Sequence, residues 1–265
     1  MATRSLPARR GGTSHRRHRC AGGVGTTTVA INLALQLAEA GRAHVGILDL
    51  HLRGGTAGVM LGVRCGSGLR VALEDPQRVD ALFLERSSVS VTDRVTLVGA
   101  EEPMDADPRP TELGVKRILS MLTARFNYVV VDVPHPPGLA ERIVLEAAQQ
   151  RLVVLGPDLV SVRDTLSLRR ALATIGSGDV ATVLNRVGLP GGIKPRLLEE
   201  GLGSAPDFVI PDLPRHLPRA AHLGRPAVRD SAALRRSLVP LLERAGASRP
   251  AAGRSLLGRL LGRKP

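Results

Sequence analysis

The chain has 265 residues, enough for one large domain or at most two small ones. Its hydrophobic content of 43% supports a core, which must be built from Leu, Val, Ile and Ala because aromatic residues make up only 2%. The two cysteines, Cys20 and Cys65, have neither the density of a disulfide framework nor metal-ligand spacing. No apolar run reaches the roughly 18–20 residues that would span a bilayer. We therefore expect a cytoplasmic protein.

The net charge of +13 comes from 37 basic and 24 acidic residues that are unevenly distributed. Six arginines precede the first acidic residue, Glu39, and six basic residues follow the last one, Glu243. The excess therefore lies mostly near the two ends, which favours attraction to an anionic surface over a DNA-reading face. Arginine outnumbers lysine 34 to 3, however, and a coding bias would explain the excess equally well.

The chain divides into three parts by composition. Residues 1–20 are rich in Arg, His and Gly, and we expect them to be disordered. Residues 21–245 alternate short apolar runs with longer helical stretches, as one domain would. Residues 246–265 are predicted to form a linker and a short basic amphipathic tail.

The elements of the domain follow a regular alternation. Strands are expected at short, β-branched runs: 44–50, 95–99, 128–133, 152–155, 181–184 and 208–210. Helices are expected between them: 28–40, 111–124, 139–148, 160–174, 194–200 and 231–245. This order predicts an α/β fold with a mainly parallel twisted sheet and helices on both faces.

A glycine-rich run leads into the first predicted helix. Residues 20–28 read Cys-Ala-Gly-Gly-Val-Gly-Thr-Thr-Thr, and Asn-Leu-Ala follows at 32–34. Glycines let backbone N–H groups turn around a phosphate, to which the helix amino terminus adds a partial positive charge. The run therefore predicts phosphate binding by Gly22, Gly23, Val24, Gly25, Thr26, Thr27 and Thr28.

This run resembles the deviant Walker A motif of ParA/MinD ATPases, which reads Lys-Gly-Gly-Val-Gly-Lys-Thr-Thr. The resemblance implies a P-loop fold that binds ATP or ADP with Mg²⁺, with Thr27 as a metal ligand. Both lysines of the motif are missing, since Ala21 and Thr26 stand in their places. A charge-assisted hydrogen bond contributes about 1.5–3 kcal/mol, so we expect binding roughly 10- to 100-fold weaker than with the lysine. Hydrolysis should be slow or absent.

Two aspartates close predicted strands. Asp49 lies near the carboxyl end of the predicted strand 44–50, and Asp132 lies near the carboxyl end of the predicted strand 128–133. Such ends face the ligand crevice of a parallel sheet, so we expect both aspartates, with Thr27, to hold the metal. Asp132 resembles the family's Walker B aspartate, although a strand-end helix cap is the alternative. The family carries a second aspartate where this chain has His51.

Three further features complete the comparison with this family. Asn185 and Pro211 match positions at which relatives contact the adenine base. Residues 14–20, where the strand before the phosphate loop should lie, contain no side chain that a central strand could bury without severe desolvation. The first strand is therefore doubtful.

Later stretches resemble the CpaE/TadZ branch, whose members localise and assemble the Tad type IV pilus. They lie at 82–86, 94–103, 126–132, 183–186 and 220–226. The resemblance implies a positioning or scaffold protein with Tad pilus assembly proteins as partners, and it also allows a homodimer. A related branch determines the septum site, and these motifs do not separate the two.

The basic tail suggests how such a protein could be placed. Four leucines in 254–264 fall within an arc of about 140° on a helix, flanked by Arg and Lys. This segment resembles the membrane-targeting tail of MinD and would lie peripherally on an anionic membrane at the inner face of the cell. A final helix packed on the domain, or a frayed end, is the alternative.

Two other functions compete with the scaffold. One is an active septum-placement or partition ATPase, against which the missing lysines and His51 count. The other is a DNA-binding protein that would use a basic cluster: Arg215, Arg219, Arg225, Arg229, Arg235 and Arg236.

Overall fold

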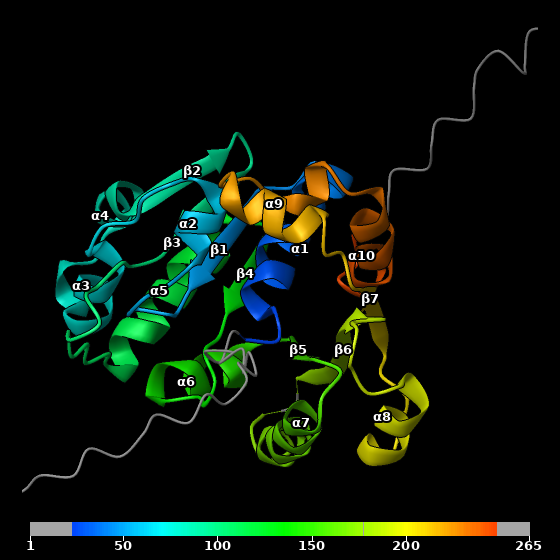
Figure 1. Cartoon of the computed structure of the whole chain (residues 1–265). Helices are drawn as coiled ribbons and strands as arrows, with labels where there is room; N and C mark the ends of the chain where they lie inside the picture. Colours follow the sequence, from blue (N-terminus) through cyan, green and yellow to red (C-terminus); the bar gives the residue numbers. More distant parts are fainter. Residues whose placement is uncertain (1–22, 177, 248–265) are drawn as a thin grey trace, which may run out of the picture.

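The structure, a computed structural model, describes residues 23–176 and 178–247 (Figure 1). Within them seven strands pair as two sheets. The first sheet has the order β2-β3-β1-β4: β2 (Ser88–Thr92), β3 (Val95–Val98), β1 (Val45–Asp49) and β4 (Tyr128–Asp132). The second has the order β5-β6-β7: β5 (Gln150–Leu155), β6 (Asp179–Val187) and β7 (Phe208–Pro211). All pairs except β2–β3 are parallel.

The helices lie on both faces of these sheets, and the predicted α/β fold is confirmed. All six expected strands and all six expected helices are present, with ends shifted by a few residues. The helices expected from the sequence are α1 (Thr26–Gly41), α5 (Glu112–Arg125), α6 (Leu139–Ala147), α7 (Leu159–Leu172), α8 (Pro195–Leu202) and α10 (Ala232–Arg244).

The sequence reading missed the short elements. These are α2 (Ala57–Leu61), α3 (Gly68–Glu74), η1 (Pro76–Arg78), α4 (Ala81–Ser87), α9 (His216–His222), η2 (Ala227–Arg229) and strand β2. Helices of five to seven residues are too short for a 3.6-residue pattern to emerge. β2 is an antiparallel edge strand with alternating Ser and Val, which differs from the continuous apolar runs of its parallel neighbours.

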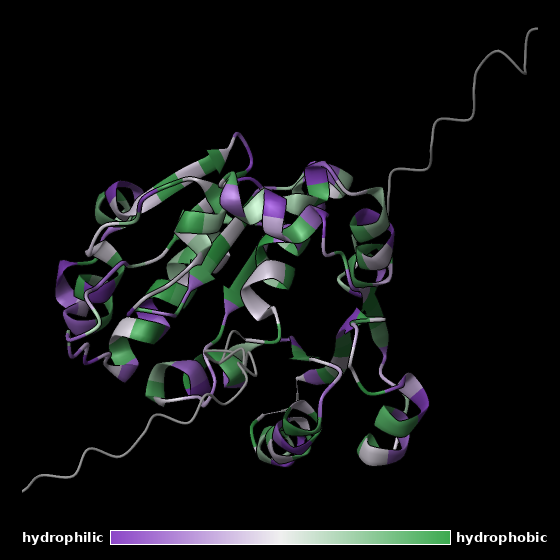
Figure 2. Ribbon diagram, in the orientation of Figure 1, coloured by the Kyte–Doolittle hydropathy of each residue, from purple (hydrophilic) through white to green (hydrophobic). Residues whose placement is uncertain are grey.

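Burial is greatest at β1, where every residue is buried between two layers of helices. The core on one side of it includes α1 and α10, and the core on the other includes α3, α5 and α6. Figure 2 shows the apolar residues gathered on the strands and on the helix faces turned toward them. β4 departs from the expectation of full burial, because residues 128–131 are only half-buried. Among the described strands β4 pairs with β1 alone, which leaves its other edge without a strand partner.

α1 is unusually well enclosed, since Val29–Ala38 are all buried. Two polar side chains in that stretch hold the helix in place. Asn32 Oδ1 accepts a 2.7 Å hydrogen bond from the backbone N–H of Val228, and Gln36 Nε2 donates one of 2.9 Å to the carbonyl of Arg235. These bonds fix α1 against η2 and α10, and so fix the start of α1 beside the ends of β1 and β4.

Some expectations concern the ends of the chain. Residues 1–20, the doubtful strand at 14–20 and the amphipathic segment 254–264 lie outside the described residues. Ala247, in the predicted linker, is 5% exposed and packs in the core with α10. None of the helices described is long and apolar enough to span a bilayer.

Candidate functional site

The site is built at the carboxyl ends of two adjacent parallel strands. Asp49 ends β1 and Asp132 ends β4, and the strand register pairs these two residues directly. Their exposures are 3% and 0%. Neighbouring strands lie about 4.8 Å apart, so two buried carboxylates are held side by side. The expected placement of both aspartates at one edge of the sheet is therefore found.

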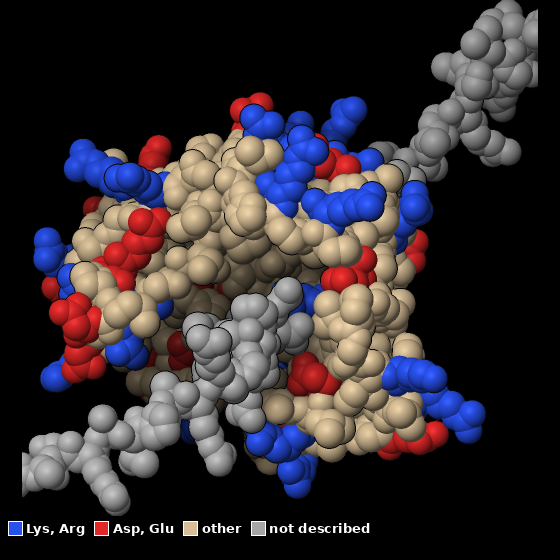
Figure 3. All heavy atoms as spheres, in the orientation of Figure 1, with Lys and Arg blue, Asp and Glu red and all other residues tan. Residues whose placement is uncertain are grey.

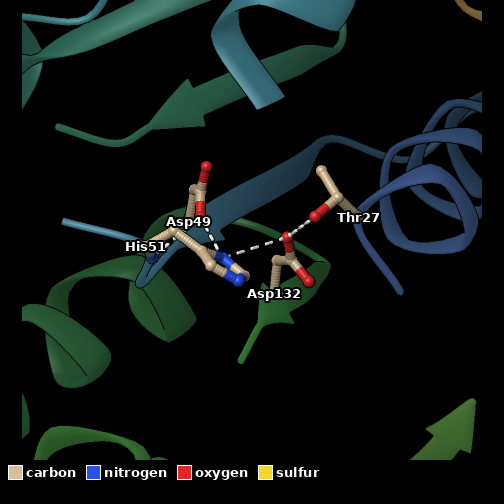
Figure 4. Close-up of polar contacts among 4 residues, drawn as sticks. All are labelled: Thr27, Asp49, His51 and Asp132. Carbon is tan, nitrogen blue, oxygen red and sulfur yellow. Dashed lines mark hydrogen bonds and ion pairs between the residues drawn. The ribbon is translucent and has the colours of Figure 1, made fainter. Parts of the chain in front are cut away.

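α1 brings the phosphate loop to the same edge. Gly25 precedes the helix with φ of 94°, a conformation that favours glycine, and its carbonyl accepts the hydrogen bond of Val29 N. Thr27, the second residue of the helix, donates from Oγ1 to Oδ2 of Asp132 at 2.5 Å (Figure 4). The two groups expected to share a metal are thus in direct contact.

His51 lies across both aspartates, which the sequence reading did not anticipate. Its backbone N–H and its ring Nδ1 are each 2.9 Å from Oδ1 of Asp49. The same Nδ1 is 3.4 Å from Oδ2 of Asp132. Figure 4 shows the imidazole turned toward the two carboxylates, with Thr27 on the far side of Asp132. Asp49, His51 and Asp132 each offer a ligand atom within 4.8 Å of the others.

This position changes the electrostatics of the imidazole. Hydrogen bonding to Asp132, and then to Asp49, raises the pKa of His51 to about 10, although partial burial acts to lower it. The imidazole is accordingly protonated at neutral pH in the absence of a metal. It then acts as a cation that offsets part of the repulsion between the two carboxylates.

Asn185 lies against the phosphate loop. Its Nδ2 donates a 2.8 Å hydrogen bond to the carbonyl of Val24, and its Oδ1 accepts one from Arg186 N. A Cβ atom on Gly25 would lie 2.5 Å from Nδ2, so only glycine fits there. Asn185 is 2% exposed and supports the loop backbone. Its expected contact with adenine, and that of Pro211 at the end of β7, stay predictions.

The other expected phosphate-loop residues divide by their placement. Gly23 is exposed, and Val24, Thr26 and Thr28 are half-buried around the start of α1. Gly22 lies outside the described residues. Thr26, at the motif's lysine position, is the first residue of α1. In the described part of the chain, no lysine or arginine forms an ion pair with Asp49 or Asp132.

A second group of residues near Asp49 was also missed. A Cβ atom on Gly55 would lie 3.0 Å from Asp49 Oδ2, so the chain after β1 passes close to the site. The backbone N–H of Cys65 donates to Glu101 Oε1 at 3.1 Å. Burial, then the charges of Glu101 and Asp49, raise the pKa of the Cys65 thiol to about 11. No motif links these segments in the sequence, since tertiary packing alone brings them together.

The donor set fits the Mg²⁺ of a P-loop site only in part. The Thr27 hydroxyl and the carboxylates supply the oxygen ligands that Mg²⁺ requires. The imidazole of His51 is not such a ligand, and it contacts both carboxylates. When bound with a nucleotide, Mg²⁺ would neutralise phosphate charge. In this chain Thr27 and Asp132 would hold it, and His51 would have to be displaced or accommodated.

Comparison with known proteins identifies the family to which this chain belongs. Residues 18–170, more than half of the chain, match the sequence profile of the ParA family, described as NUBPL iron-transfer P-loop NTPase. The chain belongs to the ParA family of P-loop NTPases. An uncharacterised ATP-binding protein of Methanocaldococcus jannaschii is 26% identical over 169 residues, which are 63% of this chain and 62% of that protein. The chain thus spans less than two thirds of that relative.

Solved structures agree on the fold. A ParA family ATPase from Chlorobium tepidum superposes with a TM-score of 0.73 at 18% identity, covering 83% of this chain and 92% of that one. The septum site-determining protein MinD of Pyrococcus horikoshii, complexed with Mg-ADP, gives 0.68 at 22% identity, with coverages of 84% and 91%. At these identities the likeness shows the fold, and the expected ParA/MinD-like architecture is confirmed.

Proposed function

We propose that this ParA-family chain is a positioning or scaffold protein for Tad-type pilus assembly that binds ATP or ADP with Mg²⁺ weakly and hydrolyses it slowly or not at all. Weak binding and slow hydrolysis are inferred mainly from one observation, the contact of His51 Nδ1 with both aspartates of the site. The CpaE/TadZ-like stretches support the pilus role. They include 126–132, which contains β4, and 183–186 in β6.

The charge at the site explains why turnover should be slow. Phosphoryl transfer needs fixed positive charge where negative charge develops on the phosphate oxygens. Thr26 offers a hydroxyl at the position of the lysine, and the cationic ring of His51 is paired with Asp49 and Asp132. Backbone N–H groups at the start of α1 remain to bind a phosphate. Binding without rapid hydrolysis follows.

Calorimetry with ATP and ADP, with and without Mg²⁺, tests the nucleotide part. Thr26→Lys should tighten Mg-ATP binding about 10- to 100-fold, because it restores one charge-assisted bond of about 1.5–3 kcal/mol. Thr123→Lys, the same exchange at an exposed residue near the end of α5, is the matched control and should change nothing, because α5 leads into the amino end of β4 and Asp132 lies at the other end. Rapid ATP turnover by the unaltered chain, abolished by Asp132→Ala, would overturn the proposal.

A septum-placement or partition ATPase is the second candidate. The direct Thr27–Asp132 contact favours it, because these are the groups that would share Mg²⁺. Deleting the coding region in the source cell separates the roles. The scaffold predicts loss of surface pili with normal septa, together with co-purification of Tad assembly proteins. Misplaced septa with normal piliation would support the second candidate instead.

Attachment to a surface belongs to the same proposal. Segment 254–264 would bind an anionic membrane, more strongly in a homodimer that presents two copies. Equal flotation with anionic liposomes, with and without residues 253–265, would contradict this.

The basic cluster of the DNA-binding alternative lies around α9 and α10, where Figure 3 shows basic side chains on the surface. Salt-dependent retention on DNA that is lost when the cluster is replaced would favour that alternative.

A further inference from the structure

The carboxyl ends of β1 and β4 bring three possible metal ligands together. Asp49 and Asp132 are buried side chains held side by side by the strand register. The ring Nδ1 of His51 faces both of their carboxyl groups. Each of the three residues offers a ligand atom within 4.8 Å of the others. Buried carboxyl groups are costly unless they are paired, hydrogen-bonded or coordinated to a metal.

The distances around His51 match the edges of a metal coordination shell. Nitrogen and oxygen ligands at about 2.1 Å from an ion lie roughly 3.0 Å apart in octahedral geometry and 3.4 Å apart in tetrahedral geometry. Nδ1 of His51 is 2.9 Å from Asp49 Oδ1 and 3.4 Å from Asp132 Oδ2. The three ligand atoms all lie within 4.8 Å of one another, so one ion could contact all of them after the side chains shift.

A second observation concerns the remaining oxygen of Asp132. This side chain is 0% exposed, and its Oδ1 has no hydrogen-bond partner among the described residues. A buried carboxylate oxygen normally has such a partner. A cation bound at this carboxylate would lower the cost of leaving Oδ1 without one.

We propose that Asp49, His51 and Asp132 form a site for a divalent first-row transition-metal ion, with Zn²⁺ and Co²⁺ favoured over Mg²⁺. Imidazole nitrogen is a preferred ligand of Zn²⁺ and Co²⁺, whereas Mg²⁺ takes oxygen ligands and keeps much of its water. The ion replaces the proton on Nδ1, which passes to solvent, and the side chain of His51 is 32% exposed for that exchange. No nucleotide is needed, because all three ligands come from the protein.

Metal titration of the full-length, nucleotide-free chain tests this inference. After treatment with EDTA, calorimetry should show one Zn²⁺ or Co²⁺ bound per chain, at least about tenfold more tightly than Mg²⁺. His51→Asp restores an oxygen ligand and should lower the Zn²⁺-to-Mg²⁺ affinity ratio at least about tenfold. The visible absorption of bound Co²⁺ should also change in this variant, because the nitrogen ligand is lost.

His44→Asp is the matched control, since this exposed histidine precedes β1 at its amino end, opposite Asp49. It should leave both the ratio and the Co²⁺ spectrum unchanged. Circular dichroism of each variant checks folding, and Asp49→Asn, which keeps the shape of the side chain, should weaken Zn²⁺ binding at least about tenfold. Mg²⁺ bound as tightly as Zn²⁺, or equal effects of His51→Asp and His44→Asp, would overturn the inference. Because nucleotide is absent, either result leaves the scaffold proposal to its own tests.

Discussion

Along α1, the stretch Val29–Ala38 is buried in the core, whereas Thr26–Thr28 at its start are half-buried beside the strand ends. The buried stretch contains the Asn-Leu-Ala expected of the family, and Asn32 is needed there to bond Val228. The start of the helix keeps the glycine turn and Thr27 but has lost the lysine. Packing therefore constrains the helix interior, while the chemistry at its end depends on a few side chains that packing does not fix.

That comparison predicts that substitutions of buried core residues lower the free energy of unfolding, whereas substitutions at the site change the affinity for ligands. The largest effect should come from Leu48→Ala in β1, whose side chain is 1% exposed and packs in the core that includes α5. The cavity should lower the free energy of unfolding by about 2–5 kcal/mol. Urea denaturation measures it. Leu197→Ala, at a side chain 57% exposed, should stay within about 0.5 kcal/mol. Equal losses in the two variants would contradict the comparison.

A smaller effect is expected from Asn32→Ala. It leaves the buried N–H of Val228 without its acceptor and removes the 2.7 Å bond to Thr28 O. Stability should fall by about 1–3 kcal/mol, measured by urea denaturation, while metal affinity at the site stays unchanged. Gln149→Ala, at an exposed side chain outside the core, is the control. A change in metal affinity as large as the change in stability would mean that the two regions of α1 are not separable.

Sequence patterns predicted the parts of this molecule that depend on local regularity. The long helices and buried strands have clear periods, and strand ends place Asp49 and Asp132 at one edge whatever the side-chain detail. The bridging position of His51 could not be predicted, because it depends on a tight turn after Asp49 and on the register between β1 and β4. The contact of Asn185 with adenine stays a prediction, whereas its hydrogen bond to Val24, 161 residues away in the sequence, was not predicted. Such contacts arise only from the folded arrangement.

Cys65 lies where the buried core meets the site. The last prediction concerns the rate at which its thiol is alkylated. Its thiol pKa is raised from 9.0 to about 11, first by burial and then by Glu101 and Asp49. Because the thiolate is the reactive form, alkylation by iodoacetamide at pH 8 should be about 100-fold slower than in the unfolded chain. The folded pKa lies above the unfolded value, so this protection persists as pH rises past 9.0 and is lost only near 11.

A Cys20→Ser variant leaves Cys65 as the single thiol, and the same variant unfolded in urea gives the reference rate. Mass spectrometry of the alkylated peptide follows the reaction. Glu101→Gln keeps the side-chain shape and removes one of the charges that raise the pKa, so alkylation at pH 8 should become faster in that variant. A folded chain that reacts as fast as the unfolded one would show that solvent reaches behind Asp49. The boundary between core and site would then lie deeper in the sheet than the structure places it.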